Sequence, residues 1–304
     1  RQARALRGAP LPLGPFVQDY YRGVDETDLR AIDPDTLAAA AAGHLRFGAV
    51  RKPGQALVRV FNPDPASDGW QSPHTVVEVI TDDMPFLVDS LAIVLNGRGF
   101  SIHTVAHPVL RVRRDRSGRI VAAGANLADG LPESWQHIEV DRTGDAAQLG
   151  ELRAHIESSL ADVRAAVEDW PKMMERARAI AADLRKGLPG IAASETQEAA
   201  EFADWLAGNH FTFLGYREYR LVRGANVDKL VPVPRSGLGL LRTGGSRQRP
   251  QPTLLQGEVR RKAREATALV VTKANSVSTV HHVTHLDYIG LKTCTALVQV
   301  TAER

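Results

Sequence analysis

The alternation of apolar and polar residues predicts a strand–helix–strand unit in the first half of the chain. Residues 74–81 (HTVVEVIT) are rich in β-branched side chains, which is typical of a strand. Apolar residues within residues 86–95 recur on one helical face, and Gly97 ends the predicted helix. Residues 101–113 predict a second strand that is interrupted at Pro108, and therefore lies at a sheet edge or contains a bulge.

Further elements are predicted on both sides of this unit. Asp33 and Pro34 provide a cap and a first-turn proline for a helix that runs to about Phe47. Residues 62–73 are rich in Pro, Asp, Ser and Gly and are predicted to form a loop. Three more strands are predicted, at residues 55–62, 119–123 and 135–140.

A long amphipathic helix is predicted in the middle of the chain. Apolar residues spaced three or four apart between Leu149 and Trp170 form one continuous stripe, which we expect to be buried. Pro171 is expected to break this helix, with a second helix continuing to Leu184. Residues 187–193 are predicted to form a linker.

The second half is predicted to be mainly β. Ser194 and Gln197 first predict a capping box for a helix that ends near Gly208. Residues 243–256 lack periodicity and are expected to form a surface loop. Strands are predicted at residues 211–222, 238–242, 269–273, 280–283 and 288–297.

The composition is that of a globular protein with room for two domains. The chain has 304 residues, of which 43% are hydrophobic and 24% charged. No apolar stretch approaches the roughly 18 residues of a membrane span, and no signal peptide is recognisable. Cys294 is the only cysteine; it excludes an internal disulfide, favours a reducing, cytoplasmic location and is expected to lie in the core. Because the chain begins with Arg1 rather than Met, we expect a segment of a longer protein.

Positive charge is concentrated between Arg217 and Arg264. This stretch contains twelve Lys or Arg residues and three acidic ones, although the whole chain carries a formal charge of only +3. A solvated loop and a surface for an acidic partner or nucleic acid are the two interpretations. Neighbouring aromatic residues, such as Phe213 and Tyr216, lie in an apolar strand and are expected to be core. We therefore predict neither nucleic acid nor a membrane as a partner.

The turn and helix after the strand at residues 74–81 offer a site for a free amino acid. The α-carboxylate of such a ligand suits the backbone N–H groups at a helix amino end, and its α-ammonium needs acceptors such as Asp82 and Asp83. Gly99 and Ser101 are expected to allow close approach of the ligand or of a partner chain. The alternative is that Asp83 only caps the helix and Gly99 only makes a turn. The predicted ligand-binding residues are Asp82, Asp83, Met84, Phe86, Gly99 and Ser101.

Two groups of histidines have spacings that allow a shared face. A metal site also needs ligand atoms that converge on one point and, in most cases, a carboxylate or thiolate. Nothing in the sequence fixes that geometry, so we interpret these histidines as surface or hydrogen-bonded residues and predict no metal. The groups are His103 with His107, and His281, His282 and His285.

No catalytic or nucleotide-binding motif is recognisable in the sequence. Gly237, Gly239, Gly244 and Gly245 do not have the G-x-G-x-x-G spacing of a dinucleotide site, and no amphipathic helix follows them directly. A phosphate-binding loop and a G-x-S-x-G nucleophile elbow are also absent from the sequence. We therefore predict no catalytic residue and no cofactor in this segment.

Several stretches, in the same order along the chain, resemble the N-terminal region of the large NAD-specific bacterial glutamate dehydrogenases. The resemblance extends from about Phe16 to the end of the chain, and ordered blocks are more specific than any single motif. The stretches are residues 81–90 (TDDMPFLVDS), 133–142 (ESWQHIEVDR), 211–221 (FTFLGYREYRL), 237–242 (GLGLLR) and 269–292 (LVVTKANSVSTVHHVTHLDYIGLK).

This resemblance implies an α+β fold of two modules. Residues 63–190 would form an ACT-like (ferredoxin-like βαββαβ) domain with long packing helices, after a helical lead and strand at residues 1–62. Residues 191–304 would form a β-rich PAS-like or second ACT-like module that is incomplete at its C-terminus. The ACT domains of the family are modules that bind amino acids, often across a dimer interface.

The resemblance also implies a function. The chain would regulate and assemble an NAD-dependent enzyme that deaminates glutamate oxidatively to 2-oxoglutarate, with NAD bound by the catalytic portion of the parent protein. Its partners would be an amino-acid effector, that catalytic portion and identical subunits. The alternative is a purely structural scaffold for oligomerisation that binds no small molecule.

The chain departs from the family pattern at two places. Residues 135–140 predict an additional strand, where an ACT domain has its second helix after the hairpin. After His281 the family is expected to have a basic residue and a proline, where this chain has His282 and Val283.

Overall fold

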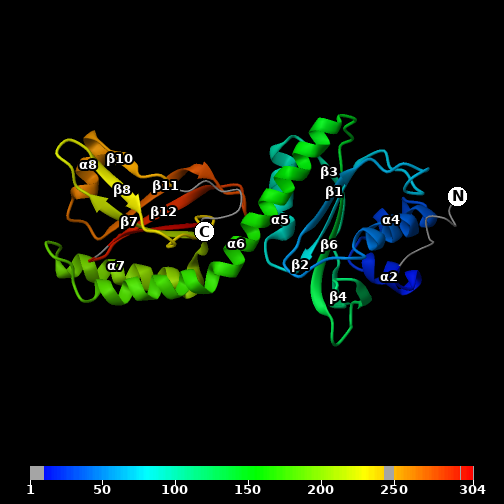
Figure 1. Cartoon of the computed structure of the whole chain (residues 1–304), viewed down its shortest axis with the longest axis horizontal. Coiled ribbons are helices and arrows are strands. Elements are labelled where there is room, and N and C mark those ends of the chain that lie inside the picture. The colour runs from blue at the N-terminus through cyan, green and yellow to red at the C-terminus, as the bar shows by residue number, and fades with distance from the viewer. Residues whose placement is uncertain (1–9, 243–249, 295, 304) are drawn as a thin grey trace. The chain divides into compact units, whose positions relative to one another are not determined.

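The computed structural model describes residues 10–242, 250–294 and 296–303, and the chain folds into two compact units (Figure 1). The first unit ends at Leu160 and the second begins at Ala161. Helix α6 (Ala146–Leu184) contains this division. Each unit has one antiparallel sheet with its own helices. The domain boundaries expected near residues 62 and 190 stay predictions.

The first unit contains a sheet whose described strands are ordered β1-β2-β6-β4-β5, with β3 also paired to β6. Helix α5 follows β2 and precedes β3, which confirms the predicted strand–helix–strand order. The strands are β1 (Leu57–Phe61), β2 (Thr75–Asp82), β3 (Ile102–Ala106), β4 (Val109–Arg114), β5 (Ile120–Gly124) and β6 (Leu131–Val140). The helices besides α6 are α2 (Leu13–Tyr20), α3 (Glu26–Arg30), α4 (Pro34–Phe47) and α5 (Leu87–Gly97).

Strand β6 is central because it separates β2 from β3 and β4. It pairs antiparallel with all three, so β2 runs parallel to β3 and β4 with one strand between them. Strand β1 pairs with the other edge of β2. Figure 1 shows α5 and α6 on one face of this sheet and α2 and α4 on the other. Consequently β6 is buried from Glu133 to Val140, and only its first two residues are exposed.

Aromatic residues pack helices α2 and α4 against the first sheet. Trp135 on β6 is fully buried, and its ring centroid lies 5.7 Å from that of Phe16 and 5.1 Å from that of His44. Leu45 and Ile80 belong to the same buried cluster. Helices α2 and α4 are therefore part of the first hydrophobic core.

The second unit contains a sheet whose described strands are ordered β10-β8-β7-β13-β12-β11, with β9 paired to β7. Helices α6 and α7 share a buried cluster with β7, β12 and β13, and Figure 1 shows both helices along one face. Phe213 and Tyr216, predicted to be core residues, are buried there. The strands are β7 (Thr212–Val222), β8 (Asp228–Pro232), β9 (Leu238–Gly239), β10 (Thr253–Leu255), β11 (Leu269–Val277), β12 (His285–Lys292) and β13 (Leu297–Glu303). The helices besides α6 are α7 (Ala193–Trp205), a π-helical turn (Leu206–His210) and α8 (Gly257–Arg264).

Pro171 does not end the long helix, contrary to the prediction. Helix α6 is continuous, with Pro171 exposed inside it. The missing N–H removes one internal hydrogen bond, but Val163 and Met174 are buried on either side of the proline, and this packing supports the helix. Trp170, expected on the buried stripe, is 40% exposed.

Two strand predictions in the second unit are wrong. Residues 280–283 form bends instead of a strand, because His281 has a left-handed backbone (φ 71°) and the Ser278 hydroxyl donates to the Val280 carbonyl. The strand predicted at residues 238–242 is only the two-residue β9. The predicted loop lies partly outside the described residues, at 243–249, and includes β10.

Two local predictions near the ends of helix α7 and strand β12 are also wrong. Ser194 and Gln197 do not form a capping box, since Ala192 is the N-cap of α7 and makes no side-chain cap bond. Cys294 is exposed, because β12 ends at Lys292 and the cysteine lies in the connection to β13. Residues 288–297 are therefore not one strand.

Gly48 provides a test of how tightly the first core is packed. A Cβ at this position would lie 2.4 Å from Trp135 and 2.5 Å from Ile80, both fully buried. We expect Gly48→Ala to lower the free energy of unfolding by about 1–3 kcal/mol, measured by urea titration. Gly150→Ala is the control, because its Cβ enters open space within helix α6, and we expect it to raise stability by up to about 1 kcal/mol. Equal effects of the two substitutions would contradict this packing.

Candidate functional site

The six predicted ligand-binding residues lie at two opposite ends of the first sheet. Asp82 ends β2 opposite Glu133, near the start of β6. The Ser101 N–H donates to Asp141, just beyond the other end of β6. The length of β6 between Glu133 and Val140 is roughly 23 Å, so the two groups do not form one niche. Asp83, Met84 and Phe86 follow Asp82 in sequence, and Gly99 precedes Ser101.

The Asp82 carboxylate is hydrogen-bonded by groups of the same chain. Arg51, which is buried, donates to Asp82 Oδ1 at 2.8 Å and to Glu133 Oε1 at 2.9 Å, while the Gly54 N–H donates to Asp82 Oδ2 at 3.0 Å. Arg114 makes a bidentate contact with Glu133, at 2.7 and 2.9 Å. Burial would raise the pKa of Glu133, but the two guanidinium groups outweigh it and lower the pKa. Asp82 therefore has a structural role as an acceptor.

The segment that follows Asp82 has two unusual local features. Phe86 is the N-cap of α5 and has a left-handed backbone (φ 72°), which is uncommon outside glycine. Asp83 is exposed, but partial desolvation of its carboxyl group still raises the pKa. Ligand binding at Asp83, Met84 and Phe86 stays a prediction, and so does a role for Gly99, whose φ is 80°.

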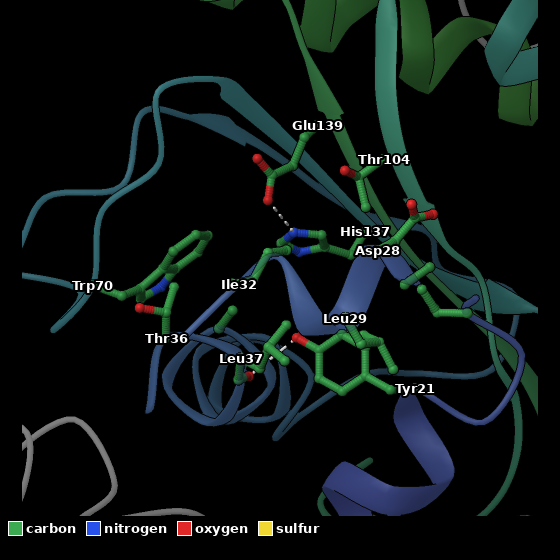
Figure 2. A pocket seen from close by; sticks show the side chains of 13 residues that line it. Tyr21, Asp28, Leu29, Ile32, Thr36, Leu37, Trp70, Thr104, His137 and Glu139 are labelled. Carbon is green, nitrogen blue, oxygen red and sulfur yellow. Dashed lines mark hydrogen bonds and ion pairs between the residues drawn. The ribbon is translucent and has the colours of Figure 1, made fainter. Parts of the chain in front are cut away.

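A groove that the sequence analysis did not identify lies elsewhere in the first unit. It has a volume of about 910 Å³, and side chains of both charges line it. A small cavity of about 20 Å³ adjoins it and shares several lining residues with it (Figure 2). The shared residues are Asp28, Ile32, Thr36, Trp70, Thr104 and Glu139.

Glu139 connects the groove with the buried part of the sheet. Figure 2 shows its carboxylate directed toward the ring of His137, with 3.5 Å between Oε1 and Nε2. Its Oε2 accepts from the Ser72 hydroxyl at 2.6 Å and lies 2.9 Å from Nδ1 of His74. Arg142 donates to the Ser72 carbonyl at 2.8 Å, which holds this wall of the groove in place.

Three polar residues are direct neighbours on three adjacent strands of the first sheet. The pairing register aligns Arg59 on β1 with Glu78 on β2, and Glu78 with His137 on β6. Arg59 donates to Glu78 Oε2 at 2.7 Å, and Glu78 Oε1 lies 3.6 Å from His137 Nδ1. From helix α4, His44 enters the same face, with its Nδ1 2.7 Å from the hydroxyl of Tyr20.

His44, Glu78 and His137 together form a compact buried cluster. One side-chain nitrogen or oxygen of each lies within 4.8 Å of those of the other two. Burial lowers the pKa of His44 to about 4. For His137, burial is outweighed by the Glu139 and Glu78 carboxylates, which raise its pKa to about 9. At neutral pH these shifts favour the neutral form of His44 and the imidazolium form of His137.

The carboxylates of this cluster are held in their ionised form. Burial opposes ionisation of Glu78, but His44, His137 and Arg59 outweigh it and lower the pKa to about 2. Burial opposes ionisation of Glu139 too, yet hydrogen bonds from its neighbours, first His137, lower its pKa to about 2. The sequence contained one signal for this cluster, which was a charged residue inside the apolar run at residues 74–81.

The histidines singled out by their spacing have separate partners. His281 Nδ1 lies 2.7 Å from a Glu303 carboxylate oxygen, and His285 Nδ1 lies 3.2 Å from the Ala274 carbonyl. His103 Nε2 lies 2.8 Å from Asp141. The structure does not bring any of these side chains to the buried cluster.

Part of the basic stretch is also engaged within the protein. Arg264 contacts the fully buried Asp228 at 2.6 Å, and Arg260 contacts it at 3.2 Å. Arg242 donates to Asp169 at 2.7 Å. These arginines therefore neutralise buried carboxylates of the second unit.

The sequence of the first unit matches a known family. Residues 16–156 match the family described as "Glutamate dehydrogenase, ACT1 domain". These residues belong to the ACT1 family. The groove and the buried cluster both lie within this ACT1 domain.

Relatives of the chain are large enzymes. It is 37% identical to the NAD-specific glutamate dehydrogenase of Pseudomonas aeruginosa over 241 residues, which are 78% of this chain and 15% of that protein. It is 33% identical to the NAD-specific glutamate dehydrogenase of Halomonas elongata over 295 residues, which are 95% of this chain and 18% of that protein. The resemblance inferred from the ordered sequence blocks is thus confirmed, and the chain spans less than a fifth of either relative. No described helix combines the length and the apolar character that crossing a membrane requires.

The ion network around Glu133 predicts a dependence of stability on pH. We expect Glu133→Gln to lower the free energy of unfolding by about 3 kcal/mol at pH 7, since it leaves the buried Arg51 without full compensation. The pKa of Glu133 is lower in the folded state, so its contribution is present above the unfolded pKa of about 4.3 and is lost as pH falls through the folded pKa. The variant should lack that part of the acid-induced loss, measured as urea midpoints between pH 7 and pH 3.

The matched control is Asp129→Asn. Asp129 pairs with Arg113, but both side chains are about half exposed. Removing this solvent-screened pair should lower stability much less than Glu133→Gln does. A similar loss in both variants would contradict a special role for the network around Glu133.

Proposed function

We propose that this chain is a non-catalytic, cytoplasmic regulatory region of an NAD-specific glutamate dehydrogenase, and that its ACT1 domain binds an amino-acid effector in the groove beside Glu139. Oxidative deamination of glutamate and the binding of NAD would belong to the catalytic portion of the parent protein. Support comes from the ACT1 match and from the names of both relatives.

The groove carries the proposal because its size and charge suit a small zwitterion. Its volume of about 910 Å³ is in the range of small-molecule sites, roughly 300–1,000 Å³. Asp28 and Glu139 offer carboxylates for an α-ammonium group. Arg142 and His74 line the same groove and suit an α-carboxylate, since a guanidinium presents five N–H donors. Trp70 supplies an apolar wall for a side chain.

We propose a ferredoxin-like core for the first unit and a PAS-like fold for the second. In the first, β1 takes the position that the last strand of a βαββαβ domain would have, beside β2. In the second, the order β8-β7-β13-β12-β11 places the first and last strands of the sheet next to each other at its centre, as in PAS-like sheets.

A scaffold that assembles identical subunits and binds no small molecule is the second candidate. One observation favours it, because Asp82, expected to bind the ligand, is held by Arg51 within the chain. That end of the sheet would then be a structural element of an assembly.

Calorimetric titration of the chain with a panel of amino acids tests the proposal. We expect saturable heat from at least one amino acid, and about 10-fold or greater weakening in Asp28→Ala, which removes a charged acceptor from the groove. Ser101→Ala, at the end of the sheet near Asp141, is the control and should bind as the unaltered chain does.

Two outcomes would overturn the groove as the effector site. Loss of binding in Asp83→Ala, with Asp28→Ala unaffected, would place the effector at the amino end of α5. Silence across the panel, together with concentration-dependent dimerisation in sedimentation experiments, would support the scaffold.

A further inference from the structure

We propose that His44, Glu78 and His137 are the protein ligands of a zinc ion in the core of the ACT1 domain. This inference does not depend on effector binding, because the three side chains lie beneath the face covered by α4, inside the fold. Two imidazoles and one carboxylate are a donor set that zinc accepts in proteins.

The first argument is that three buried polar atoms of these residues make no hydrogen bond of ordinary length within the part of the chain that the structure describes. His44 Nε2, Glu78 Oε1 and His137 Nδ1 are buried and make no hydrogen bond there. The exposed fractions of these residues are 0%, 0% and 3%. Buried polar atoms in folded proteins nearly always have a partner, and those that lack one call for an ion or water. Two of them, Glu78 Oε1 and His137 Nδ1, lie 3.6 Å apart, and one ring nitrogen of His44 lies within 4.8 Å of the ligand atoms of both residues.

The second argument is that the other polar atom of each proposed ligand has a partner within the protein. Nδ1 of His44 lies 2.7 Å from the Tyr20 hydroxyl, and Nε2 of His137 faces the Glu139 carboxylate at 3.5 Å. Oε2 of Glu78 accepts from Arg59 at 2.7 Å. Metal-binding histidines characteristically donate their other N–H to such a partner, which fixes the ring orientation.

The third argument concerns distances. Zinc bonds to nitrogen and carboxylate oxygen are about 2.0–2.2 Å, so ligand atoms around a tetrahedral ion lie roughly 3.4 Å apart. Glu78 Oε1 and His137 Nδ1 are 3.6 Å apart, and no pair in the cluster exceeds 4.8 Å. Small side-chain rotations would complete the site, and a water molecule would fill the fourth position.

The alternative to a metal ion is a proton on His137. An imidazolium at His137 between Glu78 and Glu139 accounts for two of the three convergent atoms. It gives no hydrogen bond to Nε2 of His44, a residue with one ring nitrogen within 4.8 Å of the other two ligand atoms. A metal ion accounts for all three atoms together.

Elemental analysis and cobalt substitution of the full chain test the site. We expect about one zinc per chain after dialysis against metal-free buffer, and a tetrahedral Co²⁺ absorption spectrum after exchange. Glu78→Gln and His137→Asn should each lose the stoichiometric metal. Tyr20→Phe, which removes only the hydroxyl behind His44, should weaken zinc affinity about 10-fold.

The double variant His282→Asn, His285→Asn is the control, because both of these histidines are exposed and lie in the second unit. It should keep the metal and the cobalt spectrum. Loss of metal in this control alone would assign the ion to the surface and overturn the proposal. An unaltered chain that binds neither Zn²⁺ nor Co²⁺ and melts at the same temperature with and without chelator would also overturn it, and this result does not require any variant to fold.

Discussion

The carboxylate of Glu78 lies in the middle of a sheet covered by helices on both faces, and its compensation organises the first unit. A buried carboxylate is costly unless charges and donors surround it. Compensation comes along one row of the sheet, from Arg59 on one neighbouring strand and His137 on the other. His44 approaches from helix α4. Helix α4 therefore brings a polar ring to the buried carboxylate as well as apolar side chains to the core.

Strand β6 has two chemically different ends. At one end, the paired arginines close the structure around Glu133 and leave Asp82 occupied within the chain. At the other, Glu139 has hydroxyl and imidazole partners and borders a groove. Arginine forks make rigid, geometrically specific contacts, whereas hydroxyls and imidazoles rearrange more readily. The same strand thus combines a fixed end with an end that is suited to bind something.

The local elements of the first unit could be predicted from sequence, but its site could not. Strand β2 and helix α5 follow from β-branching and from one-face periodicity, which are properties of neighbouring residues. Glu78 and His137 meet only because the β2–β6 register places them opposite each other, and no local pattern specifies a register between distant strands. The contact of Arg51 with Asp82 could not be predicted for the same reason, since Arg51 comes from a separate segment. The prediction at Pro171 failed because packing outweighed a local rule.

Helix α6 belongs to both hydrophobic cores. Leu152 and Ile156 are buried in the first unit, and Met173 and Ala177 are buried in the second, while the helix between them is continuous. Truncation at the unit boundary would therefore cut a helix instead of a linker. Each fragment would then end in a cut helix terminus whose unpaired backbone N–H or C=O groups need new partners. Expression of one unit alone calls for a boundary that retains the whole helix, with the apolar residues of its surplus half replaced by polar ones.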